Sequence, residues 1–336
     1  MFREFGIAPG HKVLDPFVGS GTTLLACKEA GVNGVGVDVA PLAVFVTQVK
    51  ISDYDLEKLR ETARWLLAQP FEKPDLLDVS GFVKQFFLKP SLEDIIFFRE
   101  KIREIRDPVV RNFFALALMN AAMKVSFAYK DGAVLKVVKK PVPPFRKFFR
   151  RVIKNMMRDL REAGFKPCEL TVYLGDARKM DFLEDETFDA IITSPPYLNK
   201  IEYTRVYRIE YELFFGNIQI DPIRSYLGLN PKNAVDFFPE LNLPEVAKAY
   251  FHDMRLSLGE MFRVLKPGGR VALVVAGGVF PDRVVESDVL VMKLAEDVGF
   301  EGERIIAVNK RVATTRRVIK IGEARESILI MRKPSS

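Results

Sequence analysis

The sequence has few of the residues that build disulfide frameworks and metal sites. Its 336 residues include two cysteines, Cys27 and Cys168, and two histidines. Two cysteines cannot supply a disulfide framework or a four-ligand zinc site, and no group of His and Cys has metal-ligand spacing. We therefore expect no metal site.

Long hydrophobic runs are also absent. No apolar stretch approaches the roughly 20 residues that cross a membrane, and the first residues, MFREFGIAPGHK, lack the apolar segment of a signal peptide. We expect a cytoplasmic protein that does not bind membranes. Glutamine is scarce as well, with four residues in a chain rich in Lys, Arg and Glu, a composition that favours a thermophilic source.

What the chain does contain is the composition of a folded protein. Apolar residues make up 48% and charged residues 28% of the sequence, which disfavours disorder. At about 100–200 residues per domain, the length fits one large domain with an insertion, or two domains.

Positive charge is concentrated in two segments. The net charge is +7, but residues 124–161 alone hold 12 basic residues against two acidic ones, with aromatic residues interleaved. A second stretch, residues 304–325, has seven basic residues and one acidic residue. Such segments favour a polyanionic partner that is contacted through its phosphates and stacked bases. A solvated helical face could carry the same charges.

Apolar runs alternate with helical patterns along much of the chain. Buried-strand runs are predicted at 12–17, 34–39, 170–177, 188–197 and 266–278. The alternation predicts a parallel sheet flanked by helices. The end of the chain is predicted to form a strand at 304–310, a basic loop at 311–324 and a final strand at 326–333.

Residues 51–166 break this alternation. They contain long amphipathic helical patterns, such as LEKLRETARWLLAQ and SLEDIIFFREKIREI, and no strand pair that would continue the sheet. A Pro-rich segment near residue 142 is predicted to separate two helices. We therefore divide the chain into an α/β domain of residues 1–50 and 167–336 and a helical, basic insertion of residues 51–166 that binds the substrate.

The first motif is the Gly-rich turn DPFVGSGTT at 15–23, between a strand and a helix. Such a turn lets a cofactor approach the backbone and places polar ligand groups at the helix N-terminus. It lacks the third glycine of a dinucleotide fingerprint and the lysine of a phosphate loop, which disfavours both of these sites. Taken alone, it could equally be a tight turn without a ligand.

The second motif, TSPPY at 193–197, follows the buried run FDAII. Its prolines fix an extended backbone, which presents a rigid carbonyl, the Ser194 hydroxyl and the Tyr197 ring at the edge where open α/β sheets bind ligands. By itself the motif could be an ordinary strand end. Its occurrence together with DPFVGSGTT favours a functional site.

Together, DPFVGSGTT and TSPPY resemble the motif pair of the S-adenosylmethionine-dependent amino-methyltransferases of nucleic acids. The SPPY form, with Ser in first place, resembles the branch that methylates N4 of cytosine. The resemblance covers about residues 10–50 and 168–333. It implies a doubly wound, seven-stranded class I methyltransferase (Rossmann-like) α/β sheet with a helical insertion, and makes residues 1–50 and 167–336 the catalytic domain.

The resemblance also implies which residues bind S-adenosylmethionine. Those expected to shape the pocket at the first motif are Asp15, Pro16, Phe17, Gly19, Ser20, Gly21 and Thr22. Asp38 would accept hydrogen bonds from the ribose hydroxyls and Asp176 from the adenine amino group, while Val39 and Ala177 would flank the adenine ring. Either carboxylate could instead cap a turn at a strand end.

The predicted catalytic residues are Ser194, Pro195, Pro196 and Tyr197. An exocyclic amine conjugated to a pyrimidine is a poor nucleophile, because its lone pair is delocalised into the ring. If Ser194 Oγ and the Pro195 carbonyl accept its two N–H bonds, the nitrogen is held towards tetrahedral geometry with its lone pair facing the methyl donor. Tyr197 would stack on the extruded base. No strong base is needed, since the proton can leave to water.

Substrate contacts are predicted in the helical pattern after the second motif and in the basic insertion. The eight candidates are Asn199, Lys200, Tyr203, Arg205, Lys139, Lys140, Arg150 and Arg151. Tyr203 could instead pack in a core.

The resulting prediction is methyl transfer to the exocyclic N4 amine of cytosine in nucleic acid. Because no β-rich recognition domain is evident, structured RNA such as ribosomal RNA is slightly favoured as the partner. The alternative is a site-specific DNA N4-cytosine methyltransferase, and the second alternative is a non-catalytic RNA-binding protein with this fold. A small-molecule or protein methyltransferase would not need the basic segment. The sequence does not indicate the oligomeric state.

Overall fold

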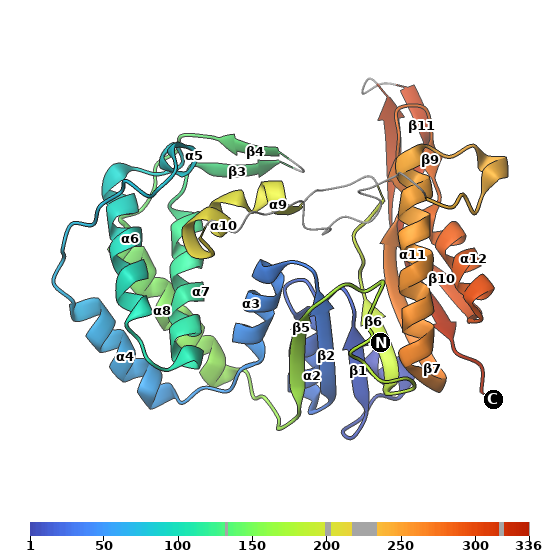
Figure 1. Cartoon of the computed structure of the whole chain (residues 1–336), viewed down its shortest axis with the longest axis horizontal. Coiled ribbons are helices and arrows are strands. Elements are labelled where there is room, and N and C mark those ends of the chain that lie inside the picture. The colour runs from blue at the N-terminus through green and yellow to red at the C-terminus, as the bar shows by residue number, and fades with distance from the viewer. Residues whose placement is uncertain (132–133, 199–202, 217–233, 316–318, 336) are drawn as a thin grey trace. The chain divides into compact units, whose positions relative to one another are not determined.

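A computed structural model describes the chain apart from residues 132–133, 199–202, 217–233, 316–318 and 336 (Figure 1). The chain divides into two units. The sheet unit consists of Met1–Thr47, Phe165–Ile201 and Pro222–Ser336, and the helical unit consists of Gln48–Gly164 and Glu202–Asp221. Our division of the sequence left residues 202–221 in the catalytic part, whereas here they group with the helical unit.

The sheet unit is built on seven strands in the order β10-β11-β7-β6-β1-β2-β5 (Figure 1). Their bounds are β1 Lys12–Asp15, β2 Asn33–Asp38, β5 Leu170–Leu174, β6 Phe188–Thr193, β7 Leu265–Ala276, β10 Glu301–Thr315 and β11 Ile319–Arg332. Strand β11 is antiparallel to both of its neighbours, and every other neighbouring pair is parallel. The predicted seven-stranded, doubly wound α/β sheet is thereby confirmed.

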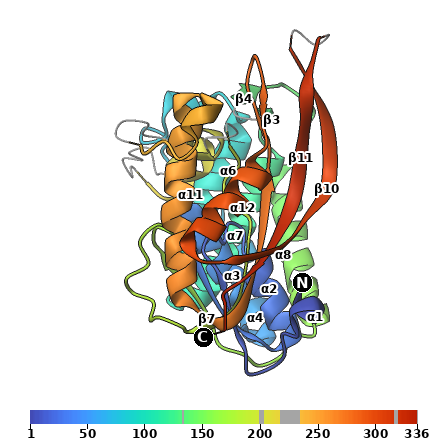
Figure 2. The same cartoon turned by 90° about the vertical axis from the view of Figure 1, so that its right-hand side faces the viewer.

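Successive strand residues point to opposite sides of the sheet, and here both sets are apolar. Helices therefore cover both faces. Leu14 and Ile191 pack in one core with residues of α11 (Glu245–Val264) and α12 (Ser287–Val298). Their neighbours Val13 and Ile192 pack on the other face, with residues of α1 (Phe2–Phe5) and α2 (Thr22–Ala30). Figure 2 shows α11 and α12 side by side against the sheet.

The parallel strands bring the two motifs to one edge. Strand β1 lies between β2 and β6, and β5 pairs with the outer side of β2. Because the carboxyl ends of parallel strands meet at the same edge, Asp15, Asp38 and Thr193, the last residues of β1, β2 and β6, lie along it. Asp176 follows β5 by two residues. This edge contains the first and second motifs.

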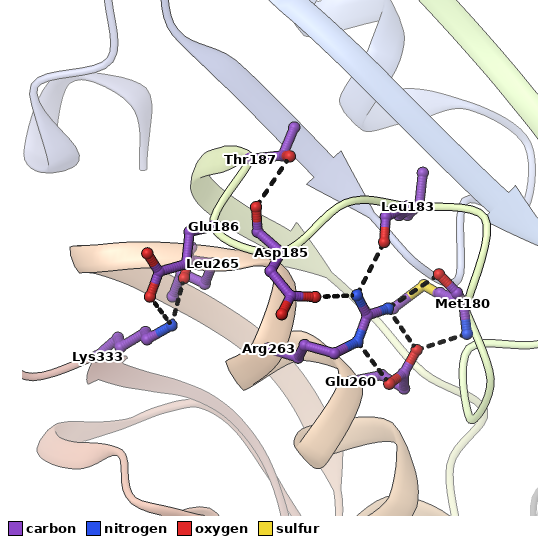
Figure 3. Close-up of polar contacts among 9 residues, drawn as sticks. All are labelled: Met180, Leu183, Asp185, Glu186, Thr187, Glu260, Arg263, Leu265 and Lys333. Carbon is purple, nitrogen blue, oxygen red and sulfur yellow. Dashed lines mark hydrogen bonds and ion pairs between the residues drawn. The ribbon is translucent and has the colours of Figure 1, made fainter.

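The connection from β5 to β6 is held by one arginine of α11 (Figure 3). The Arg263 guanidinium donates to the carbonyls of Leu183 and Met180, at 2.8 and 2.9 Å, and to Asp185 Oδ1 at 2.6 Å. Glu260, one turn earlier on the helix, accepts from Arg263 Nε at 2.9 Å and from the Met180 amide at 2.6 Å. The loop that leads into β6 is thus fixed to α11.

The last two strands form a long hairpin, which corrects a prediction. Strand β11 pairs with β7 only over Glu326–Arg332 in the described residues, so the outer parts of β10 and β11 pair with each other alone. Figure 2 shows this ribbon extending past the other strands. The basic loop predicted at 311–324 is wrong: Arg311–Thr315 and Ile319–Ala324 are strand. The β-branched residues of these segments favour extended strands. The pairing between β10 and β11 continues beyond the residues that pair with β7.

The helical unit has its own phenylalanine-rich core. Its elements are α4 Leu56–Ala68, α5 Gly81–Lys84, α6 Lys89–Arg103, α7 Pro108–Lys124, β3 Ala128–Asp131, β4 Val134–Val137, α8 Phe145–Glu162, α9 Tyr203–Val206 and α10 Arg208–Phe214. Phe98 and Phe149 pack with ring centroids 5.0 Å apart. Asp55 caps α4 by accepting from two backbone amides, and Asp107 caps α7 in the same way. The sequence did not predict the β3–β4 hairpin.

The remaining elements are α3 Pro41–Ile51, which crosses the unit boundary, the 3-10 helix Pro239–Leu241, and the short hairpin β8 Gly278–Val279 with β9 Val284–Val285. The helix predicted after the second motif is described as α9 and α10, interrupted at Tyr207. Among the described residues, no helix is long and apolar enough to cross a membrane.

Candidate active site

The Gly-rich turn of the first motif adopts a backbone that requires glycine. Gly19 and Gly21 have φ of 51° and 81°, in the left-handed region. Thr47, a fully buried residue of α3, donates to the Gly19 carbonyl at 3.0 Å. A Cβ on Gly21 would lie 2.7 Å from Thr47 Oγ1. The turn is therefore fixed in shape, and it leads into α2, whose first turn has no side-chain cap.

Asp15 connects the two motifs. Its carboxylate is buried and accepts a hydrogen bond from Thr193 Oγ1 at 2.6 Å and one from the Phe17 amide at 3.2 Å. Burial raises its pKa to about 6, although the Thr193 bond acts in the opposite direction. Asp15 is predicted to shape the cofactor pocket, and in the structure its carboxylate also contacts Thr193, the residue before Ser194. This contact could not be predicted, because Thr193 lies 178 residues away along the chain.

Asp38 ties the end of β2 to the Gly-rich turn. Its Oδ2 accepts from the Gly19 amide at 2.9 Å and its Oδ1 from the Ala40 amide at 2.9 Å. Burial raises the pKa of this carboxyl, and the backbone hydrogen bonds oppose the rise. The amides of Gly19, Ala40 and Val39 do not fill all the acceptor positions of this carboxylate. The carboxylate can therefore both shape the turn and accept from a ligand hydroxyl.

Asp176 belongs to an ion-pair network beyond β5. Arg178 Nε donates to Asp176 Oδ1 at 2.9 Å, and Arg178 Nη1 donates to Asp253 Oδ1 at 2.7 Å. The amide of Gly175 donates to the Asp38 carbonyl at 2.9 Å, which places the two predicted cofactor carboxylates on neighbouring strand ends. Ala177 is buried and Val39 is half-buried.

The second motif is anchored on both sides of Ser194. Thr193 is bonded to Asp15, and the Tyr197 hydroxyl donates to Glu326 Oε1 on β11 at 2.7 Å. Leu198 is fully buried against Gly278, where an added Cβ would lie 2.6 Å from the leucine. Ser194 itself is exposed, and its hydroxyl makes no hydrogen bond to the described residues. Pro195 is buried and Pro196 is half-buried. The loop thus presents a serine with an available acceptor.

Three supporting residues were missed by sequence reasoning. They are Thr47 at the Gly-rich turn, Glu326 at the Tyr197 hydroxyl, and Tyr250 of α11. The Tyr250 hydroxyl is buried without a hydrogen-bond partner in the described part of the chain, and burial raises its pKa, with a smaller contribution from Tyr197. None of the three lies in a recognisable motif.

The predicted substrate contacts that the structure describes belong to the helical unit. Asn199 and Lys200 lie outside the described residues, and only the backbone of Tyr203 is described, in α9. Arg205 is exposed on α9, in the helical unit. The four candidates of the insertion, Lys139, Lys140, Arg150 and Arg151, are all exposed in the helical unit.

The edge fits an adenosine-type cofactor. It offers a glycine turn without side chains at Gly19 and Gly21, two carboxylates on neighbouring strand ends, and a buried small residue, Ala177, next to Asp176. No group of three or more His, Cys, Asp or Glu in the described ranges could hold a metal ion.

Comparison with known proteins agrees with this arrangement. The model of a DNA methylase family, the N6 and N4 methyltransferases, matches residues 5–46, which span β1, the Gly-rich turn and β2. The match therefore covers the first motif and Asp38.

Curated relatives match over most of the chain. Type II methyltransferase M.BsoBI of Geobacillus stearothermophilus is 25% identical, and the match covers 99% of this chain and 82% of that protein. Type II methyltransferase M.AvaI of Nostoc sp. is 23% identical over 89% of this chain and 75% of its own length. Among solved structures, a SAM-dependent methyltransferase from Methanosarcina mazei is 12% identical with a TM-score of 0.35, covering 97% of this chain and 93% of that one.

The strand order is that of the class I methyltransferase fold, and S-adenosylmethionine is the cofactor of this class. The sequence matches support the N4/N6 DNA methylase family and a nucleic-acid methyltransferase. They favour DNA, which was our alternative, so the preference for RNA is corrected. They do not support ribosomal RNA processing or a thermophilic source. RNA was preferred because the sequence contains no evident β-rich recognition domain. The helical unit is not such a domain.

Proposed function

We propose that the protein transfers the methyl group of S-adenosylmethionine to the exocyclic N4 amine of cytosine in DNA. The observation that carries the proposal is the exposed Ser194 hydroxyl, which has no hydrogen-bond partner among the described residues and lies between two anchored residues, Thr193 and Tyr197. A serine in this position of the SPPY motif is what the resemblance associates with N4 of cytosine. The match to the DNA methylase family supports DNA as the substrate.

The sheet unit's own residues would activate the amine by position. Ser194 Oγ and the Pro195 carbonyl accept its two N–H bonds, which fixes the nitrogen and directs its lone pair away from the pyrimidine plane. The cofactor supplies an electrophilic methyl group on sulfur. Transfer of that methyl group to the amine nitrogen would leave the demethylated cofactor as the leaving group and release the amine proton to water.

Asp15 and Thr193 are positioning residues in this proposal. Their hydrogen bond joins the Gly-rich turn, which would hold the methyl donor, to the strand that presents Ser194. Donor and acceptor sites are thereby held in one rigid edge, and small errors in the distance between reacting atoms are costly to the rate. Tyr197, fixed by Glu326, would offer its ring to the extruded base.

Product analysis tests the proposal. The purified protein is incubated with labelled S-adenosylmethionine and, separately, with unmethylated genomic DNA and unmodified ribosomal RNA, and nucleosides are resolved by mass spectrometry. We expect label in N4-methyldeoxycytidine. A reaction without the protein is the control.

Two other products would contradict parts of the proposal. Label in N6-methyldeoxyadenosine would overturn the choice of cytosine and keep the DNA methylase family. Label in RNA alone would overturn DNA as the substrate. Cofactor binding without label in either polymer would overturn the catalytic proposal.

A further inference from the structure

A groove runs between α4 and α8 of the helical unit. Its volume is about 440 Å³, and it is open to solvent. Its floor is apolar and consists of Leu56, Ala63, Leu67, Ile153 and Met157. The floor is where the two amphipathic helices pack, so the positions of the helices are set by core contacts and not by the charges above them.

The walls of the groove are cationic. Six basic side chains line it, namely Arg60, Arg64, Arg150, Lys154, Arg158 and Arg161, and no carboxylate is among the lining residues. Three of the six have an acidic neighbour on their own helix: Arg60 pairs with Glu57, Arg158 with Asp159 and Arg161 with Glu162. Such exposed pairs are weak.

The other three cations have no ion pair with any described residue. Arg64, Arg150 and Lys154 are exposed, one on α4 and two on α8. Arg150 and Lys154 are four residues apart, a spacing at which like charges on a helix repel each other. The packed floor holds these like charges close together. Binding of an anion that neutralises several of them at once is therefore favourable.

We propose that this groove holds the phosphodiester backbone of DNA. The proposal rests on the function proposed above, which supplies the polymer. Cations at helical spacing along α8, an 18-residue helix, form a row that can contact successive phosphates, and arginine binds phosphate oxygens in a bidentate manner. Contacts of this kind fix the position of the DNA without reading its sequence. The groove is therefore an anchor for any DNA, separate from the residues that act on the base.

The test is the salt dependence of DNA binding. The variant Arg64→Gln, Arg150→Gln, Lys154→Gln removes the three unpaired charges and keeps good helix formers. Fluorescence anisotropy with a labelled duplex is measured between about 50 and 200 mM salt. We expect the slope of log K against log salt to fall by about 2 to 3, at roughly 0.9 per phosphate contact, and affinity near 100 mM salt to fall at least tenfold. The loss is the same for target and non-target duplexes.

A matched control removes the same charge elsewhere in the helical unit. Lys84→Gln, Lys89→Gln, Arg106→Gln alters three exposed basic residues that do not line the groove and form no ion pair with the described residues. We expect its affinity to stay within about twofold and its slope within about one unit of the unaltered protein. Circular dichroism and thermal melting confirm that both variants are folded.

Three results would overturn the proposal. Equal losses in both variants would show a general charge effect, and an unchanged slope in the groove variant would show that the groove does not contact phosphates. Binding to phosphatidylserine vesicles that depends on the three groove residues, with DNA binding unaffected, would assign the groove to a lipid surface. Because binding is measured without turnover, failure of methyl transfer leaves this result interpretable.

Discussion

Arginines of the sheet unit and of the helical unit have different surroundings. Arg178 and Arg263 in the sheet unit each contact two carboxylates, and Arg263 also holds two backbone carbonyls. In the helical unit, Arg64 and Arg150 are exposed without ion pairs among the described residues. Arg178 and Arg263 therefore fix loops of the sheet unit, whereas Arg64 and Arg150 leave positive charge available on the helical unit. Net charge alone does not distinguish these two uses.

The comparison is tested most strongly by matched arginine substitutions. Arg263→Met removes the donor to the Leu183 and Met180 carbonyls, leaving these partly buried acceptors unpaired, and also removes the ion pair with the exposed Asp185. We expect a loss of about 3 kcal/mol in the free energy of unfolding. Arg158→Met in the helical unit breaks only an exposed pair with Asp159 and is expected to cost less than about 0.5 kcal/mol. Urea denaturation measures both, and similar values would contradict the comparison.

The buried carboxyl group of Asp15 makes the stability of the protein depend on pH. Burial raises the pKa of Asp15 from 3.8 to about 6. The folded state then binds the proton more tightly than the unfolded state, so this group's contribution to stability is present below pH 4 and is lost as pH rises to about 6. In the unaltered protein we expect the free energy of unfolding to fall by about 3 kcal/mol across that range, and in Asp15→Asn we expect this fall to be absent. Urea denaturation from pH 4 to pH 7 measures the difference.

Thr193→Val supplies the companion variant. Because the Thr193 hydroxyl lowers the pKa of Asp15, its removal should move the fall in stability to higher pH. An identical pH dependence in the unaltered protein and in Asp15→Asn would show that Asp15 does not titrate as described.

A smaller effect is expected at the Gly-rich turn. Gly21→Ala places a Cβ 2.7 Å from Thr47 Oγ1 at a φ of 81°, which strains the turn. We expect the affinity for S-adenosylmethionine to fall about tenfold, equivalent to roughly 1.4 kcal/mol, by isothermal titration calorimetry. Gly164→Ala in the helical unit has a similar φ of 58° with nothing within 4 Å of the added Cβ. It should leave cofactor affinity unchanged, and an equal loss would show that Gly21 acts only through general stability.

The sheet, and the edge at which the two motifs meet, could be predicted because their signals are local. Each parallel strand is a short apolar run, and the residues at the strand ends, including Asp15, Asp38 and Ser194, belong to motifs that can be recognised from a few neighbours. The order of the strands then follows from the fold that the motif pair implies.

What could not be predicted depends on contacts between distant residues. Glu326 meets Tyr197 across 129 positions, and Thr193 meets Asp15 across 178, without any pattern that links them. Basic residues interrupt the apolar pattern in the outer part of the β10–β11 hairpin, so the sequence predicts a loop there. In the structure the two strands pair with each other in this part. The grouping of residues 202–221 with the helical unit is likewise a matter of tertiary packing.

The most direct test of the account is the single-turnover methylation rate of Ser194→Ala at saturating DNA, with Ser335→Ala, another exposed serine of the sheet unit, as the control. The account predicts that Ser194→Ala transfers the methyl group at least about 100-fold more slowly, because one acceptor that positions the amine is lost. It also predicts that cofactor affinity and the salt dependence of DNA binding stay close to those of the unaltered protein. A rate equal to that of Ser335→Ala would remove Ser194 from the reaction and contradict the central claim.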